Sequence, residues 1–231
     1  MRIAFLMLSA ALVLTAGPPG FASGGGMMRQ SPPPPVPQQP RLQTPEQQAA
    51  SVYNDGVRLV KKADKAQEAA GAASDTGRKD KEAKEAQEKY SAALAKFQQA
   101  VQLDPNSHEA WNYVGYSNRK LGNYREALAA YDKALSIKPG YPEALEYRGE
   151  AYLGLDHIPD AKQTYLDLYA GDRKLADKLL TAMKAWVAAQ RAAPGGASSG
   201  VDDFDHWIQE RAQISAQTAM LTRAGTAASW R

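Results

Sequence analysis

The chain has 231 residues, of which 44% are hydrophobic and 23% are charged, as expected for one folded domain with tails. Its net charge is +3, but lysines and arginines alternate with acids over most of the length. Since no continuous basic stripe could follow a phosphate backbone, we expect no nucleic-acid partner. The chain has no cysteine, which excludes disulfides and attachment of a lipid to a cysteine.

Residues 1–22 have the pattern of a signal peptide. Arg2 supplies a minimal positive start, and the apolar run from Ile3 to Ala16 is too short to span a bilayer comfortably. Cleavage after Ala16 and cleavage after Ala22 fit equally well, and an uncleaved membrane anchor is the alternative. We therefore expect export to a periplasm, with an extracellular location as the alternative, and no stable membrane span once the signal is removed.

The rest of the chain divides by composition. Residues 23–45 are rich in proline and glycine, which predicts an extended tether; a polyproline ligand for a partner is the alternative. Residues 46–192 have helical patterns without strand-like alternation. A second linker is predicted over 193–200, followed by a C-terminal helix and tail over 201–231.

A period of 34 residues runs through the helical region. It pairs Phe97 with Tyr131, Pro105 with Pro139, Gly115 with Gly149, Ala127 with Ala161, and Tyr131 with Tyr165. Small residues such as Gly115 let two antiparallel helices approach closely, while Tyr131 fills the gap between them. The segment from Leu121 to Asn123 is the predicted turn. Each repeat is thus a helical hairpin that must stack on its neighbours to bury its apolar face.

These residues resemble the tetratricopeptide repeat family. The family pattern is matched by Trp111, Gly115, Ala127, Tyr131 and Pro139, and in the next repeat by Leu145, Gly149, Tyr152, Ala161 and Tyr165. Asn118 departs from the pattern, and Arg173 replaces the closing proline of the third repeat. The resemblance implies an all-α fold, a short solenoid of stacked antiparallel hairpins, with repeats over 46–107, 108–141 and 142–171.

The first repeat is longer than the others. Gly56 takes the role of Gly115, and the interval from Gly56 to Ala93 is 37 residues where that from Gly115 to Ala127 is 12, so 25 residues are extra. Helix-forming segments flank a turn at Gly71–Gly77, with alanines at 63, 66 and 70 opposite those at 83, 86 and 93. We expect an arm that protrudes over Lys61–Lys84, with solvated charges; a docking role is the alternative.

Two further helices are predicted after the third repeat. The helix at 172–192 carries an apolar side formed by Leu175, Leu179, Met183, Trp186 and Val187, as a capping helix needs. The helix that follows the second linker carries a short apolar stripe formed by Phe204, Trp207, Ile208 and Ile214. This stripe is expected to pack back on the solenoid, with display to a partner as the alternative.

The sequence has no signature of catalysis. Its three histidines lie far apart, and it contains no glycine-rich phosphate loop and no nucleophile elbow. Glu146 and Glu150 are one helical turn apart, but we expect them to be solvated acids rather than an acid–base pair. We therefore expect no enzyme activity, no cofactor and no metal.

Binding is the function that the pattern favours. The first helix of each hairpin lines a concave groove, which we expect to present Asn112, Tyr116, Arg119, Glu146, Glu150 and Leu153. Ordinary surface is the alternative for these residues. A family variant that holds the carboxylate ends of chaperone tails uses lysines, an arginine and asparagines on these helices, and the matching positions here are Tyr53, Val57, Tyr113, Glu143 and Tyr147. None of these is a cation, so that ligand is not expected. Instead, Arg119 and Lys120 opposite glutamates favour a segment with both charge signs.

The sequence therefore predicts an exported scaffold or adaptor that binds a protein or peptide segment in its groove in the cell envelope. One alternative is an accessory or regulatory subunit of an envelope enzyme, to which this chain contributes a carboxylate. Another is a purely structural spacer between membrane and wall.

Overall fold

A computed structural model of the chain describes residues 44–194 and 199–228, with side chains up to Leu221 in the last helix. The predicted signal peptide and most of the predicted tether lie outside the described residues. The described part contains eight helices and no strand: α1 (Pro45–Ala72), α2 (Thr76–Leu103), α3 (His108–Lys120), α4 (Tyr124–Ile137), α5 (Pro142–Gly154), α6 (Ile158–Gly171), α7 (Arg173–Ala192) and α8 (Ser199–Ala228).

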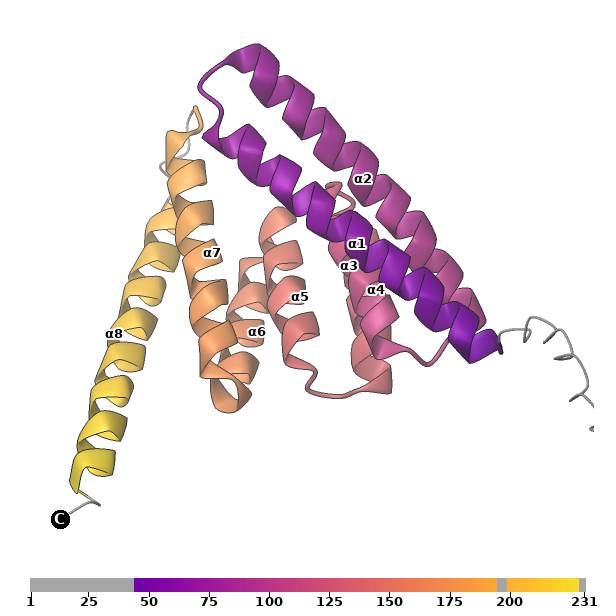
Figure 1. The fold of residues 1–231 in the computed structure, drawn as a ribbon. Helices are drawn as coiled ribbons and strands as arrows, with labels where there is room; N and C mark the ends of the chain where they lie inside the picture. The colour runs from indigo at the N-terminus through magenta and orange to yellow at the C-terminus, as the bar shows by residue number, and fades with distance from the viewer. Residues whose placement is uncertain (1–43, 195–198, 229–231) are drawn as a thin grey trace, which may run out of the picture. The chain divides into compact units, whose positions relative to one another are not determined.

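Consecutive helices pack against one another as antiparallel hairpins (Figure 1). The pairs are α1 with α2, α3 with α4, and α5 with α6, and each hairpin packs against the next. Helix α7 packs against α5 and α6, and α8 packs against α7. The predicted all-α stack of hairpins is confirmed.

Glycine–ring contacts close the first two hairpins. A Cβ atom added to Gly56 of α1 would lie 2.7 Å from Cε1 of Phe97, and one added to Gly115 of α3 would lie 2.6 Å from Cδ1 of Tyr131. Both rings are completely buried. The equivalence of Gly56 and Gly115 is therefore confirmed. The third glycine differs, because Gly149 faces Leu179 of α7, and a Cβ atom added to Gly149 would lie 2.5 Å from the nearest methyl carbon of that leucine.

Backbone caps and turns separate the helices. Helix α1 begins at Pro45, inside the predicted tether, because the side chain of Thr44 accepts a hydrogen bond from the Gln47 amide in a capping box. The predicted turn at Leu121–Asn123 is confirmed, with Gly122 at φ +83°. In the next hairpin Asp156, at φ +59°, occupies the corresponding position.

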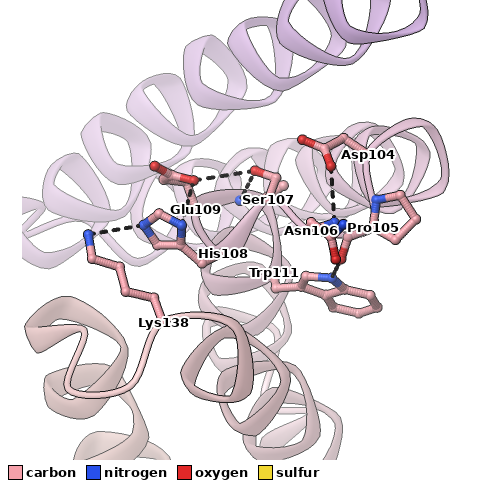
Figure 2. Close-up of polar contacts among 9 residues, drawn as sticks. Asp104, Pro105, Asn106, Ser107, His108, Glu109, Trp111 and Lys138 are labelled. Atoms are coloured by element: carbon pink, nitrogen blue, oxygen red, sulfur yellow. Dashed lines mark hydrogen bonds and ion pairs between the residues drawn. The ribbon is translucent and has the colours of Figure 1, made fainter.

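The connection between α2 and α3 is fixed by local hydrogen bonds (Figure 2). Ser107 caps α3 by accepting from the Ala110 amide at 3.1 Å. The indole Nε1 of Trp111 donates to the Pro105 carbonyl at 2.9 Å, so this tryptophan ties the new helix to the preceding turn. His108 lies 3.2 Å from the ammonium of Lys138, which follows α4.

The first hairpin is extended, as predicted. Helices α1 and α2 have 28 residues each, whereas α3 has 13 and α4 has 14. Buried alanines form the predicted seam between them: Ala63, Ala66, Ala70, Ala86 and Ala93. The turn is shorter than predicted, since α2 already begins at Thr76 with its N-terminus capped by Asp75.

The expectation that the whole span from Lys61 to Lys84 protrudes is wrong for the part nearest the second repeat, which includes Ala63, Asp64 and Ala66. Asp64 accepts a hydrogen bond from the Tyr116 hydroxyl of α3 at 2.7 Å, and Ala63 and Ala66 belong to a core cluster against which Tyr116 and Leu121 pack. This part of the arm is therefore attached to the second repeat.

The two last helices complete the stack. In α7 the predicted Leu179, Met183 and Val187 are buried, as the capping role requires. Helix α8 begins at Ser199, inside the predicted linker, and buries Phe204 and Ile208. The Trp207 ring meets the Tyr165 ring edge-on, with 5.4 Å between centroids. The expectation that this helix packs back on the solenoid is confirmed. Over 44–194 and 199–228, no helix is both long enough and apolar enough to cross a membrane.

We expect Gly115→Ala to destabilise the protein by about 1–3 kcal/mol, because the new methyl group would overlap the ring of Tyr131. Gly71→Ala is the matched control, since Gly71 also lies in a helix but has nothing within 4 Å of the position of an added Cβ. Urea unfolding monitored by circular dichroism measures both. An unchanged midpoint for Gly115→Ala would contradict the close approach of α3 and α4.

Candidate functional site

A pocket of about 320 Å³ lies among α1, α3, α5 and α7, the first helices of successive hairpins and the capping helix, with Tyr124 at the start of α4 also in its lining. Its lining includes charged, aromatic and apolar side chains: Gln67, Arg119, Lys120, Tyr124, Glu150, Leu153, Gly154, Ala182 and Trp186. Three of the predicted groove residues, Arg119, Glu150 and Leu153, come together here. Lys120, Gln67 and Trp186 were not among the predicted site residues.

An ion pair between Arg119 and Glu150 joins α3 to α5 at this pocket. Only 12% of the arginine side chain and 22% of the glutamate side chain are exposed. The guanidinium also lies over the rings of Tyr116 and Tyr147, 5.2 Å from each centroid. Although burial opposes ionisation of both groups, the pair raises the pKa of Arg119 and lowers that of Glu150. Both charges are thus held in place.

Glu146, one turn before Glu150, is completely buried beneath Lys178 of α7. The Lys178 ammonium donates to Oε2 at 2.9 Å, and Oε1 has no hydrogen-bond partner among the described residues. Burial raises the pKa of Glu146 to about 8, and the nearby carboxylate of Glu150 adds to the rise. Burial thus favours the protonated form of Glu146, whereas the Lys178 ammonium favours the ionised form. The expectation that both acids are solvated is wrong, because α5 is covered on this side by α7.

Asp64 holds two tyrosine hydroxyls beside the pocket. It accepts from Tyr90 at 2.5 Å and from Tyr116 at 2.7 Å, so one half-buried carboxylate connects α1, α2 and α3. Burial and this hydrogen bond raise the pKa of Tyr116. No separate signal in the sequence pointed to Asp64, which lies among the mixed charges of the arm. Finding it would have required knowing that this turn of α1 packs against α3.

The other predicted groove residues lie deeper. Asn112 is 3% exposed and does not line the pocket. Tyr116 is half-buried behind Arg119. Leu153 lines the pocket while its side chain belongs to the core beneath it, with 4% exposed. Asn112 and Glu146 are therefore buried and do not form the surface of the groove.

A second pocket of about 330 Å³ lies between the start of α1 and the α2–α3 connection, with the acids Glu46, Asp104 and Glu109 in its lining. Two of these acids already have local partners (Figure 2). Asp104 accepts from the Asn106 amide at 3.0 Å, and Glu109 lies 3.1 Å from the His108 ring. We therefore assign the candidate site to the first pocket.

The histidines lie in separate environments, as their spacing indicates. Each lies near an acid on its own helix or at its start: His108 near Glu109, His157 near Asp160 and His206 near Glu210. In residues 44–194 and 199–221, no group of three or more histidine or acidic side chains could hold a metal ion.

Comparison with known families identifies the repeats. Two family models, both described as tetratricopeptide repeat, match residues 82–142 and 119–186. The two matches together cover α3 to α6, most of α2 and part of α7. No curated protein matches the chain.

We expect Glu146→Gln to stabilise the protein at high pH. The folded state keeps the Glu146 proton up to about pH 8, whereas a glutamate in water has an ordinary pKa of 4.5, so wild-type stability falls as the pH rises between these values. The neutral glutamine removes this loss. Its advantage over wild type in unfolding free energy should grow by at least about 1 kcal/mol between about pH 5 and about pH 9.

Urea unfolding at the two pH values measures this difference. Glu143→Gln, which removes an exposed carboxylate from the same helix, is the control. Its difference from wild type in unfolding free energy should be the same at the two pH values. A constant difference for Glu146→Gln as well would show that Glu146 is ionised in the folded protein.

Proposed function

We propose, from the tetratricopeptide repeats that this chain contains over residues 82–186, that it is an exported scaffold which binds a segment of another protein in the groove formed by α1, α3, α5 and α7. Such repeats form protein-interaction scaffolds, and their first helices line the surface that receives a partner. The groove is the part of this chain where these helices come together.

One observation carries the proposal: a single open pocket is lined by side chains from all four of these helices. Trp186 and Tyr124 are partly exposed in it, and aromatic residues are typical anchors of protein interfaces. Arg119 and Glu150 are held rigidly at its floor. A pre-formed floor reduces the entropy lost when a partner binds.

The alternative of an accessory enzyme subunit has weaker support. The pKa values of Glu146 and Glu150 are shifted in opposite directions, as an acid–base pair requires. However, Glu146 is completely buried beneath Lys178, and Glu150 is paired with Arg119. Neither carboxyl group is free to reach a substrate in this arrangement.

A photo-crosslinking amino acid at position 67, introduced into the full chain in cells, tests the binding groove. Gln67 is exposed and lines the pocket, so we expect a discrete crosslinked product with a protein partner. The control position is Lys133, which is exposed on the second helix of its hairpin. Absence of a product from position 67, or the same products from both positions, would contradict the proposed groove.

The export proposal rests on the apolar run in residues 1–22. In a bacterial host with two membranes, we expect the mature protein in the periplasm, with an N-terminus at Gly17 or Ser23. A variant without residues 1–22 should remain in the cytoplasm. Amino-terminal sequencing of the fractionated protein measures both, and an intact Met1 on cytoplasmic protein would contradict export.

A further inference from the structure

The pocket contains more positive than negative charge once its internal pairs are counted. The charged residues of the lining are Arg119, Lys120 and Glu150, and Glu150 is paired with Arg119. Glu146 lies below the lining and accepts a hydrogen bond from Lys178. Asp64, which does not line the pocket, accepts hydrogen bonds from the hydroxyls of Tyr90 and Tyr116. The acids that suggested a partner segment of mixed charge are therefore used within the protein, and that expectation is replaced by a cationic pocket.

Of the two cations that line the pocket, Arg119 is paired with Glu150, whereas Lys120 has no ion pair in the described part of the chain. Its ammonium lies over the rings of Tyr90 and Tyr116, 5.5 and 5.8 Å from their centroids. Among the described residues, no carboxylate lies within ion-pairing distance of it. Burial and the neighbouring Arg119 lower the pKa of Lys120, with Lys178 acting in the same direction and Asp64 and Glu150 opposing. A further negative charge at this position would therefore be stabilised.

Apart from Gln67, the remaining lining of the pocket is apolar or aromatic. Leu153, Tyr124, Ala182 and Trp186 surround the polar floor. A volume of about 320 Å³ accommodates one or two side chains of an extended segment rather than a folded element. Its occupant must therefore combine an acidic group with an adjacent apolar one.

We propose that this pocket receives an internal acidic residue of the partner segment, whose carboxylate pairs with Lys120 while the neighbouring apolar side chain packs on Trp186 and Leu153. This inference rests on the proposed function and adds the chemistry of the partner to it. The second pocket, lined by Glu46, Asp104 and Glu109, has the opposite charge and would repel the same segment.

Three peptides test the proposal on the full chain labelled with ¹⁵N. The first is acetyl-Gly-Gly-Glu-Leu-Gly-Gly-amide, the second has Gln in place of Glu, and the third has Gln and a free terminal carboxylate. We expect the Glu peptide to shift the indole signal of Trp186 in nuclear magnetic resonance spectra, and to bind at least about 5-fold more tightly than the Gln peptide. Its affinity should fall as the pH rises and Lys120 loses its proton.

Lys120→Met keeps most of the aliphatic stem and removes the charge, so it should abolish the preference for the Glu peptide. Lys133→Met, on the outer helix α4, should preserve it. Equal binding of the Glu and Gln peptides, a preference that survives Lys120→Met, or no shift of Trp186 would each overturn the proposal. Tighter binding of the free-carboxylate peptide than of the Glu peptide would overturn it in favour of a chain terminus.

The two proposals fail in different ways. A crosslink at position 67 together with equal binding of the Glu and Gln peptides would leave the groove as a binding site and reject the acidic partner. No crosslink at position 67 would reject the groove itself.

Discussion

Contact between an aromatic ring and a bare glycine backbone sets the geometry on which the rest of the structure depends. Phe97 lies against Gly56 and Tyr131 against Gly115, at distances that leave no room for a Cβ atom. Each contact fixes how closely the two helices of a hairpin approach, and hence where the first helix faces the next hairpin. Tyr116 and Tyr147 on successive first helices then meet edge-on, with 5.0 Å between centroids. The charged residues of the pocket sit on the helices placed in this way.

Burial determines what those charged residues can do. Removing water from Arg119 and Glu150 is unfavourable, and the pair is maintained because each supplies the opposite charge that the other needs. Loss of either partner would leave an uncompensated charge between α3 and α5, so the pair also favours one alignment of the two hairpins. Glu146 is under the same constraint, because burial raises its pKa while it accepts a hydrogen bond from Lys178. The floor of the groove is thus fixed before any partner arrives.

The repeat period predicted the features that arise within a hairpin. These are the equivalence of Gly56 and Gly115, the turn at Gly122, and the extension of the first hairpin. The period also indicated Arg119, Glu150 and Leu153, because their helix positions follow from the hairpin geometry. It could not predict that Gly149 faces Leu179 or that Lys178 covers Glu146, since α7 lies outside the repeat pattern. Similarly, mixed charges predict a solvated arm but do not reveal that Asp64 reaches α3.

The extended first hairpin belongs to the site itself. Lys120 ends α3 five residues after Gly115, so an α1 of matching length would end near Lys61, five residues after Gly56. Asp64 and Gln67 lie beyond that point. Asp64 positions the Tyr116 hydroxyl, and Gln67 contributes to the lining of the pocket. The additional turns of α1 therefore supply both a support and a wall that a hairpin of ordinary length would lack.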